Sequence, residues 1–94
     1  MVEAVGIRGL TTLYAPLYDA LSKGSRLFID SDRMAVDPAM EIDDFLQFSL
    51  LDGVEISDEL LDITEASVRG GWDPELTERT LGWIAKHRQR NQAA

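Results

Sequence analysis

The feature that most constrains the fold is a helix-start signal that occurs twice, as Asp37-Pro38 and as Asp73-Pro74. An aspartate before a helix accepts hydrogen bonds from free backbone N–H groups, and proline suits the first helical position because its missing N–H is not needed there. Apolar residues recur every three or four positions after both pairs. The sequence therefore predicts one helix from Pro38 to near Asp52 and another from Pro74 into the basic C-terminal segment.

Capping and periodicity predict two further helices. Ser57 precedes two acidic residues, which favour the positive N-terminal end of a helix, and this predicts a helix through about Val68. Leucines spaced four apart predict a helix over about 12–22. The residues expected on the inner faces, in chain order, are Leu13, Leu17 and Leu21; Ile42, Phe45, Leu46 and Ser49; Leu60, Ile63 and Ser67; Leu76, Thr80, Trp83, Ile84 and His87.

Residues 26–36 are the least regular part of the chain. Their short apolar stretches are divided by a polar tetrad, which fits either a strand or an apolar loop. We therefore expect a mainly α fold, a small four-helix domain with a long first loop. The alternative is a small α/β domain with three short strands, at residues 5–7, 27–29 and 54–56.

A chain of 94 residues suits a single domain over 1–94, with 91–94 expected to fray. The absence of cysteine excludes disulfides and thiolate zinc sites and is compatible with a reducing cytoplasm. No apolar run approaches the roughly 18 residues that a membrane span needs, and the N-terminal residues do not look like a secretion signal. We expect a cytoplasmic protein.

Charge is segregated along the chain. Residues 34–68 carry ten carboxylates and no lysine or arginine, whereas the last dozen residues carry bases and no acid. The formal net charge is −8 at pH 7. Such a chain repels nucleic acid and anionic membranes and favours a basic protein surface. The expected partner is therefore a protein, and neither nucleic acid nor a membrane.

Residues 34–59 resemble the part of acyl carrier proteins that contains the second and third helices. Their last seven residues, Gly-Val-Glu-Ile-Ser-Asp-Glu, match the family's Gly-(Ile/Val)-Glu-Ile-Pro-Asp-Glu apart from the serine. Without a gap, Asp37 then falls on the aspartate before the family's modified serine, and Ile42, Phe45 and Leu46 fall on its core positions. The resemblance implies a helical bundle whose acidic second helix docks to basic patches on partner enzymes.

Pro38 stands where acyl carrier proteins have the serine that bears phosphopantetheine, and proline has no hydroxyl to modify. The resemblance therefore implies a docking module without a cofactor. A working carrier modified at another serine is an alternative; Ser31 follows an aspartate but is expected to lie in a turn. A third alternative is a regulatory adapter, chaperone or inhibitor that is unrelated to carriers and covers a basic surface.

Four residues are expected to contact the partner. Glu41, Asp43 and Asp44 gather on the predicted second helix, and an acidic surface of this kind steers a basic partner. Trp72 lies in a predicted turn, where a large aromatic side chain can anchor an interface.

The sequence contains no complete catalytic or metal-binding motif, so we expect no enzymatic activity. Asp30, Asp32 and Glu41 have the spacing of the first, third and twelfth residues of a calcium-binding loop. The fifth and sixth positions of such a loop need a ligand and a glycine, but both are apolar residues here. His87 is the single histidine and cannot build a histidine-based triad or a two-histidine metal site. The order of residues 54–59, a short apolar stretch followed by a helix start, is similar to that of a ribbon-helix-helix antitoxin. That module needs a basic strand face to bind DNA, whereas this segment is acidic, which argues against it.

Overall fold

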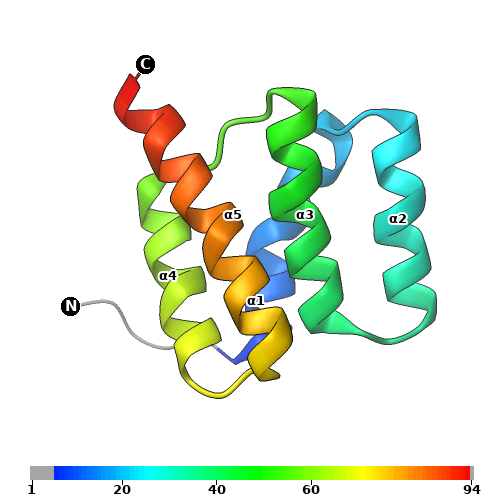
Figure 1. Ribbon diagram of the computed structural model, residues 1–94. Coiled ribbons are helices and arrows are strands. Elements are labelled where there is room, and N and C mark those ends of the chain that lie inside the picture. Colours follow the sequence, from blue (N-terminus) through cyan, green and yellow to red (C-terminus); the bar gives the residue numbers. More distant parts are fainter. Residues whose placement is uncertain (1–5, 94) are drawn as a thin grey trace.

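The computed structural model describes residues 6–93, and within that range it has five α-helices, one 3-10 helix and no strand (Figure 1). The elements are α1 (Ile7–Tyr14), η1 (Ala15–Ala20), α2 (Lys23–Met34), α3 (Pro38–Asp52), α4 (Asp58–Arg69) and α5 (Pro74–Ala93). The prediction of a mainly α fold is confirmed. The α/β alternative is wrong at 27–29, which lie in α2, and at 54–56, which form no strand; Val5 of the other expected strand lies outside the described residues.

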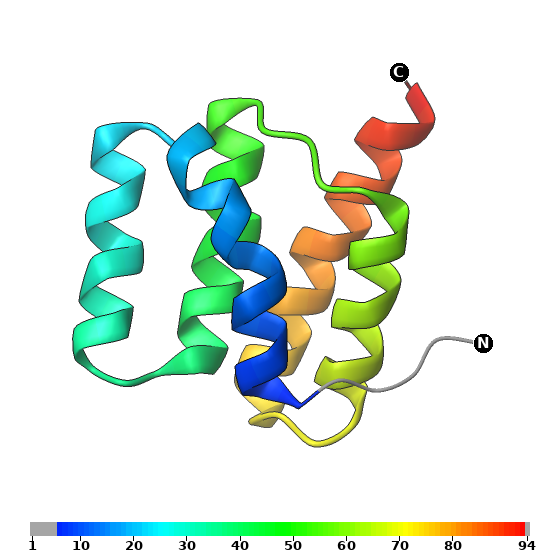
Figure 2. The same ribbon diagram turned by 180° about the vertical axis from the view of Figure 1, so that it is seen from behind.

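The central helix is α3, which packs against α1, α2 and α5. Figure 1 shows α4, α5, α3 and α2 side by side, with α1 behind the space between α5 and α3. Seen from behind, in Figure 2, α1 and η1 lie across the back of this row. The helix α2 is therefore at the edge of the bundle, and no other helix of residues 6–93 covers the front of the α2–α3 pair.

The core joins one side of each helix and contains the residues Leu10, Tyr14, Leu21, Ile29, Ile42, Phe45, Leu46, Ile56, Leu61 and Ile84. Tyr14 is its largest member, and its ring centroid lies 5.6 Å from that of Phe45. Its hydroxyl forms a 2.7 Å hydrogen bond with the hydroxyl of Thr64, which joins α1 to α4. Burial raises the pKa of Tyr14, so this hydroxyl stays neutral.

The first helical segment differs from the prediction. Instead of one α-helix over 12–22, α1 is followed by the 3-10 helix η1, and Pro16 lies in the first turn of η1. Proline has no N–H to donate and clashes with the preceding turn, so the α-helical hydrogen bonds do not continue past it. Leu10 and Tyr14, which lie four residues apart in α1, face the core, whereas Leu13 is 42% exposed.

The helix α2 replaces the expected long first loop, and this accounts for the additional α-helix. Ser22 caps α2, because its Oγ accepts the backbone N–H of Ser25 at 3.2 Å. The strand or loop expected over 26–36 rested on two short apolar stretches, 27–29 and 34–36, divided by a polar tetrad. In the first stretch only Ile29 is buried, whereas Leu27 and Phe28 are exposed.

The other three helix starts are confirmed. Asp37 accepts the backbone N–H of Met40 at 3.2 Å, Ser57 that of Leu60 at 3.2 Å, and Asp73 that of Glu75 at 2.9 Å. The inner face of α3 is as predicted, but that of α4 is shifted by one position in its first two turns. Its buried residues are Leu61, Thr64, Ser67 and Val68, with Leu60 and Ile63 partly buried.

The C-terminal helix α5 extends further than predicted. It reaches Ala93, and the side-chain amide of Asn91 donates to the carbonyl of Ile56 at 2.8 Å and to Asp58 at 3.0 Å. These bonds tie the end of α5 to the α3–α4 connection. Residues 91–93 thus form the last turn of α5, and Ala94 lies outside the described residues; the expected fraying of 91–94 stays a prediction.

Candidate partner-binding site

The three acidic residues predicted to bind a partner are buried in the described chain. Glu41 is 7% exposed, Asp43 is 0% exposed and Asp44 is 8% exposed. The reason is the central place of α3, whose sides face α2 and α5 as well as α1. The expected exposed acidic face on this helix is corrected accordingly, and a role of these residues in partner binding stays a prediction.

Arginines from the neighbouring helices neutralise two of these carboxylates. Asp43 accepts a hydrogen bond from Arg79 Nε at 2.9 Å and another from the hydroxyl of Thr80 at 2.8 Å, which joins α3 to α5. Glu41 pairs with Arg33 at 3.3 Å, which joins α3 to α2. A buried carboxylate needs partners of this kind, because its loss of water is otherwise not compensated.

Asp44 faces a second carboxyl group, that of Asp32 on α2. Burial, the hydrogen bond to Asp32 and the charges of Asp32 and Asp43 raise the pKa of Asp44 to about 8, although Arg79 opposes the change. Oδ2 of Asp32 is buried without a hydrogen-bond partner among the described residues. Two carboxyl groups in contact are stable when they share a proton. The raised pKa favours a protonated Asp44 at neutral pH, and this form can donate to Asp32.

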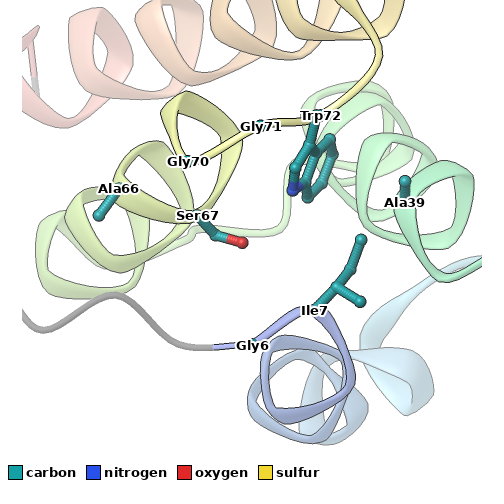
Figure 3. A pocket seen from close by; sticks show the side chains of 8 residues that line it. All are labelled: Gly6, Ile7, Ala39, Ala66, Ser67, Gly70, Gly71 and Trp72. Carbon is teal, nitrogen blue, oxygen red and sulfur yellow. The ribbon is translucent and has the colours of Figure 1, made fainter.

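Trp72 lies in the connection between α4 and α5, and its ring is half-buried. It lines a pocket of about 470 Å³ together with Ile7, Ala39 and Ser67, here called the Trp72 pocket (Figure 3). Figure 3 shows the indole beside α3, with Ile7 of α1 below it and the hydroxyl of Ser67 on the opposite side of the opening. The predicted anchor is thus placed at a surface opening, with part of its ring still accessible.

A group of exposed carboxylates lies at the end of the bundle where α3 and α5 begin. Asp37, Asp73 and Glu75 line a hollow of about 530 Å³, here called the acidic hollow, and none of them forms an ion pair with another described residue. Its other lining residues are Ala39, Met40, Leu76 and Arg79. Since Arg79 is bound to Asp43, the hollow combines an apolar lining with uncompensated negative charge.

The sequence did not indicate the acidic hollow, because its residues come from segments far apart in the chain. Asp37 and Asp73 were expected as helix caps, and both of these roles are confirmed. Glu55 and Glu59 are also exposed, but they lie near the start of α4, at the opposite end of the bundle (Figure 1). The two ends thus offer separate groups of carboxylates.

The remaining candidate ligands are engaged in other contacts. Asp30 accepts the hydroxyl of Tyr18 at 2.7 Å, and within residues 6–93 no group of three or more acidic or histidine side chains is arranged to hold a metal ion. His87 is fully buried, and its Nε2 lies 2.7 Å from the carbonyl of Leu46, to which it donates. Burial lowers the pKa of His87, so the ring is neutral and links α5 to α3.

Comparisons of the chain with protein-family models, curated proteins and solved structures gave no match. The resemblance to acyl carrier proteins stays a prediction. In the structure Pro38 is the first residue of α3, and Ser31 lies exposed within α2, not in the expected turn. No helix of residues 6–93 is both long enough and apolar enough to cross a membrane.

Proposed function

We propose that this chain is a non-enzymatic, acidic helical interaction module that docks to a basic protein surface through the acidic hollow. The observation that carries the proposal is the position of Asp37, Asp73 and Glu75, which line one hollow and have no ion-pair partner within residues 6–93. These carboxylates are free to bind the cations of a partner. Inside the bundle, Glu41 and Asp43 already pair with arginines.

The lining of the acidic hollow suits a lysine or arginine side chain. The aliphatic stem of such a residue packs on Met40 and Leu76, while its charged group reaches the carboxylates. Asp37 and Asp73 use Oδ1 for the backbone N–H groups of their helices, which leaves the second oxygen of each for a ligand. The net charge of −8 adds long-range attraction, which raises the association rate with a basic partner.

The Trp72 pocket extends this site. Ala39 lines both the acidic hollow and the Trp72 pocket, so the two openings are neighbours. A partner segment that places a basic residue in the hollow brings a nearby apolar residue to Trp72. Aromatic anchors beside charged groups are typical of the residues that dominate binding energy at interfaces. The expected partner element is therefore an amphipathic segment with basic and apolar residues, as an adapter or inhibitor of a basic protein would recognise.

Fluorescence anisotropy with a labelled, lysine- and arginine-rich amphipathic peptide tests the docking site. Glu75→Lys plus Glu78→Lys reverses one charge of the acidic hollow and the exposed charge of Glu78, which lines a neighbouring opening beside Trp72. Glu55→Lys plus Glu59→Lys is the matched control at the other end. Both pairs change the net charge equally and spare the helix caps. We expect the first pair to weaken binding about tenfold, or about 1.4 kcal/mol, and the control pair to have a smaller effect. Equal losses would indicate unspecific attraction and contradict the site.

The proposal includes the absence of carrier chemistry, because Pro38 has no hydroxyl. Incubation with coenzyme A and a phosphopantetheinyl transferase of broad specificity, followed by intact-mass measurement, tests this part separately. We expect an unchanged mass. A gain of one phosphopantetheine would favour a working carrier, and peptide mapping would then begin with the exposed Ser31.

A further inference from the structure

We infer that the chain associates with a second copy of itself through the outer side of α2 and α3. This surface, here called the α2–α3 face, consists of Leu27, Phe28, Phe48 and Leu51. It shares no residue with the acidic hollow, so the inference is independent of the proposed function.

Two leucines give the α2–α3 face its exposed apolar area. Leu27 is 63% exposed and Leu51 is 74% exposed. Each lies two residues from a buried residue of its own helix, Ile29 in α2 and Ser49 in α3. Two residues correspond to about 200° around an α-helix, so both leucines point away from the core.

Two aromatic rings stack across the helix pair. Phe28 and Phe48 are stacked, with ring centroids 4.6 Å apart, and Phe28 remains exposed. Gly24 lies one turn before Phe28, and a Cβ placed there would meet open space, so another backbone can approach this part of α2 closely. No other helix of the described chain crosses the front of α2 and α3 (Figure 1). Contiguous exposed apolar patches on soluble proteins are a common mark of interaction sites.

The charge distribution selects a second copy as the occupant of this face. Two chains of charge −8 repel each other wherever exposed carboxylates meet. The carboxylates of α2 and α3 are buried or half-buried, whereas the fully exposed ones belong to other elements or to the α3 cap. The exposed Lys23 at the start of α2 adds positive charge at the edge of the face. Like-charged copies therefore meet here with the least repulsion.

The same distribution argues against a basic partner at this face, because such a partner would find no fully exposed carboxylate on α2 or on α3 itself. In a two-fold arrangement a face contacts its own copy, so apolar surface automatically meets apolar surface. Salt screens the repulsion between the copies but leaves the apolar contact in place. Self-association is therefore expected to strengthen with salt, opposite to docking at the acidic hollow.

Sedimentation velocity of the full chain over a concentration series, at low and high salt, tests the inference. We expect a monomer–dimer equilibrium that shifts toward dimer at high salt. Leu27→Glu plus Leu51→Glu is expected to weaken dimerisation at least tenfold. Leu13→Glu, a control at an exposed leucine of α1, is expected to leave it unchanged.

Leu27→Gln plus Leu51→Gln provides the same comparison without new charge, and circular dichroism verifies that each variant is folded. A wild-type chain that stays monomeric at all concentrations and salt levels would overturn the inference. Dimers that persist in both double variants, or that Leu13→Glu disrupts equally, would place the interface elsewhere and also overturn it. Loss of peptide binding by Glu75→Lys plus Glu78→Lys has no bearing on these outcomes, which keeps the two proposals separable.

Discussion

The α2–α3 pair and the end of the bundle at the acidic hollow place charge in opposite ways. In the helix pair, Asp32, Asp43 and Asp44 lie inside, and apolar side chains face outward. At the acidic hollow, carboxylates are exposed beside an apolar lining. The difference shows that the position of a carboxylate in the fold decides whether it is available to a partner. The number of carboxylates in the sequence segment does not decide this.

The largest effect is expected from the carboxylate that is most completely enclosed. Asp43→Ala removes the partner of Arg79 and Thr80 and leaves both polar groups uncompensated between α3 and α5. Because the Arg79 side chain is partly exposed and can turn toward water, we expect a loss of about 2–3 kcal/mol, below the full cost of breaking a buried pair. Urea unfolding followed by circular dichroism measures it.

The matched control for this change is Asp62→Ala. Asp62 pairs with Arg88 at the surface, where water and salt screen the interaction, so the expected loss is below about 1 kcal/mol. Similar losses in the two variants would show that the carboxylates inside the bundle contribute no more than exposed ones, which would break the comparison between the two regions.

The second effect concerns the proton between Asp44 and Asp32. In the folded chain Asp44 keeps its proton up to a pH of about 8, whereas an unfolded aspartate loses its proton at about pH 3.9. The contribution of this group to stability is therefore complete below about pH 4 and is lost as the pH rises to about 8. Asp44→Asn cannot ionise and still donates to Asp32, so we expect higher stability than wild type at pH 8.

Urea unfolding between about pH 7.5 and pH 9 checks this expectation, because an unfolded histidine has a pKa of about 6.5 and burial lowers the pKa of His87, so this ring is almost entirely neutral in both states in that range. The wild-type chain is expected to lose stability with rising pH in this range, and Asp44→Asn to show a flatter dependence. Asp62→Asn, which alters an exposed carboxylate, serves as the control and should keep the wild-type slope. A wild-type slope in Asp44→Asn would contradict the shared proton.

The parts of the fold that the sequence predicted correctly depend on neighbours along the chain. The caps at Asp37, Ser57 and Asp73 act on N–H groups two or three residues away, so local sequence was sufficient. The helix α2 escaped prediction because its run of three apolar residues has the pattern of a strand. Helical periodicity is weak there, since Ile29 is the only one of the three that faces the core.

The candidate site was not predictable from local sequence, because its contacts join distant residues. Asp43 is neutralised by Arg79, which lies 36 positions away in the chain. The acidic hollow likewise unites Asp37 with residues of the α5 start. An acidic segment without bases looks uncompensated until the fold shows which arginines reach it. Trp72 could be identified as a candidate because its turn is local, but its pocket depends on α1 and α3.

The smallest effect is expected in the turn between α2 and α3, which lies beside the acidic end. Val36 has a φ of 52°, in the left-handed region, where a β-branched side chain is strained by about 1–2 kcal/mol. Its side chain is exposed, so replacement loses little packing. Val36→Asn, which tolerates this conformation, is expected to raise the free energy of unfolding by about 1 kcal/mol. Thermal and urea unfolding measure the gain.

Ala35→Asn provides the control for this variant, because Ala35 precedes Val36 in the same turn but has an ordinary helical φ of −77°. An equal gain from both variants would show that the amide side chain stabilises the turn for another reason than relief of strain. Because Val36 belongs to neither the acidic hollow nor the α2–α3 face, Val36→Asn should leave peptide binding and dimerisation unchanged. A change in either one would mean that the turn transmits its conformation to that surface, and the two regions could then no longer be treated as independent.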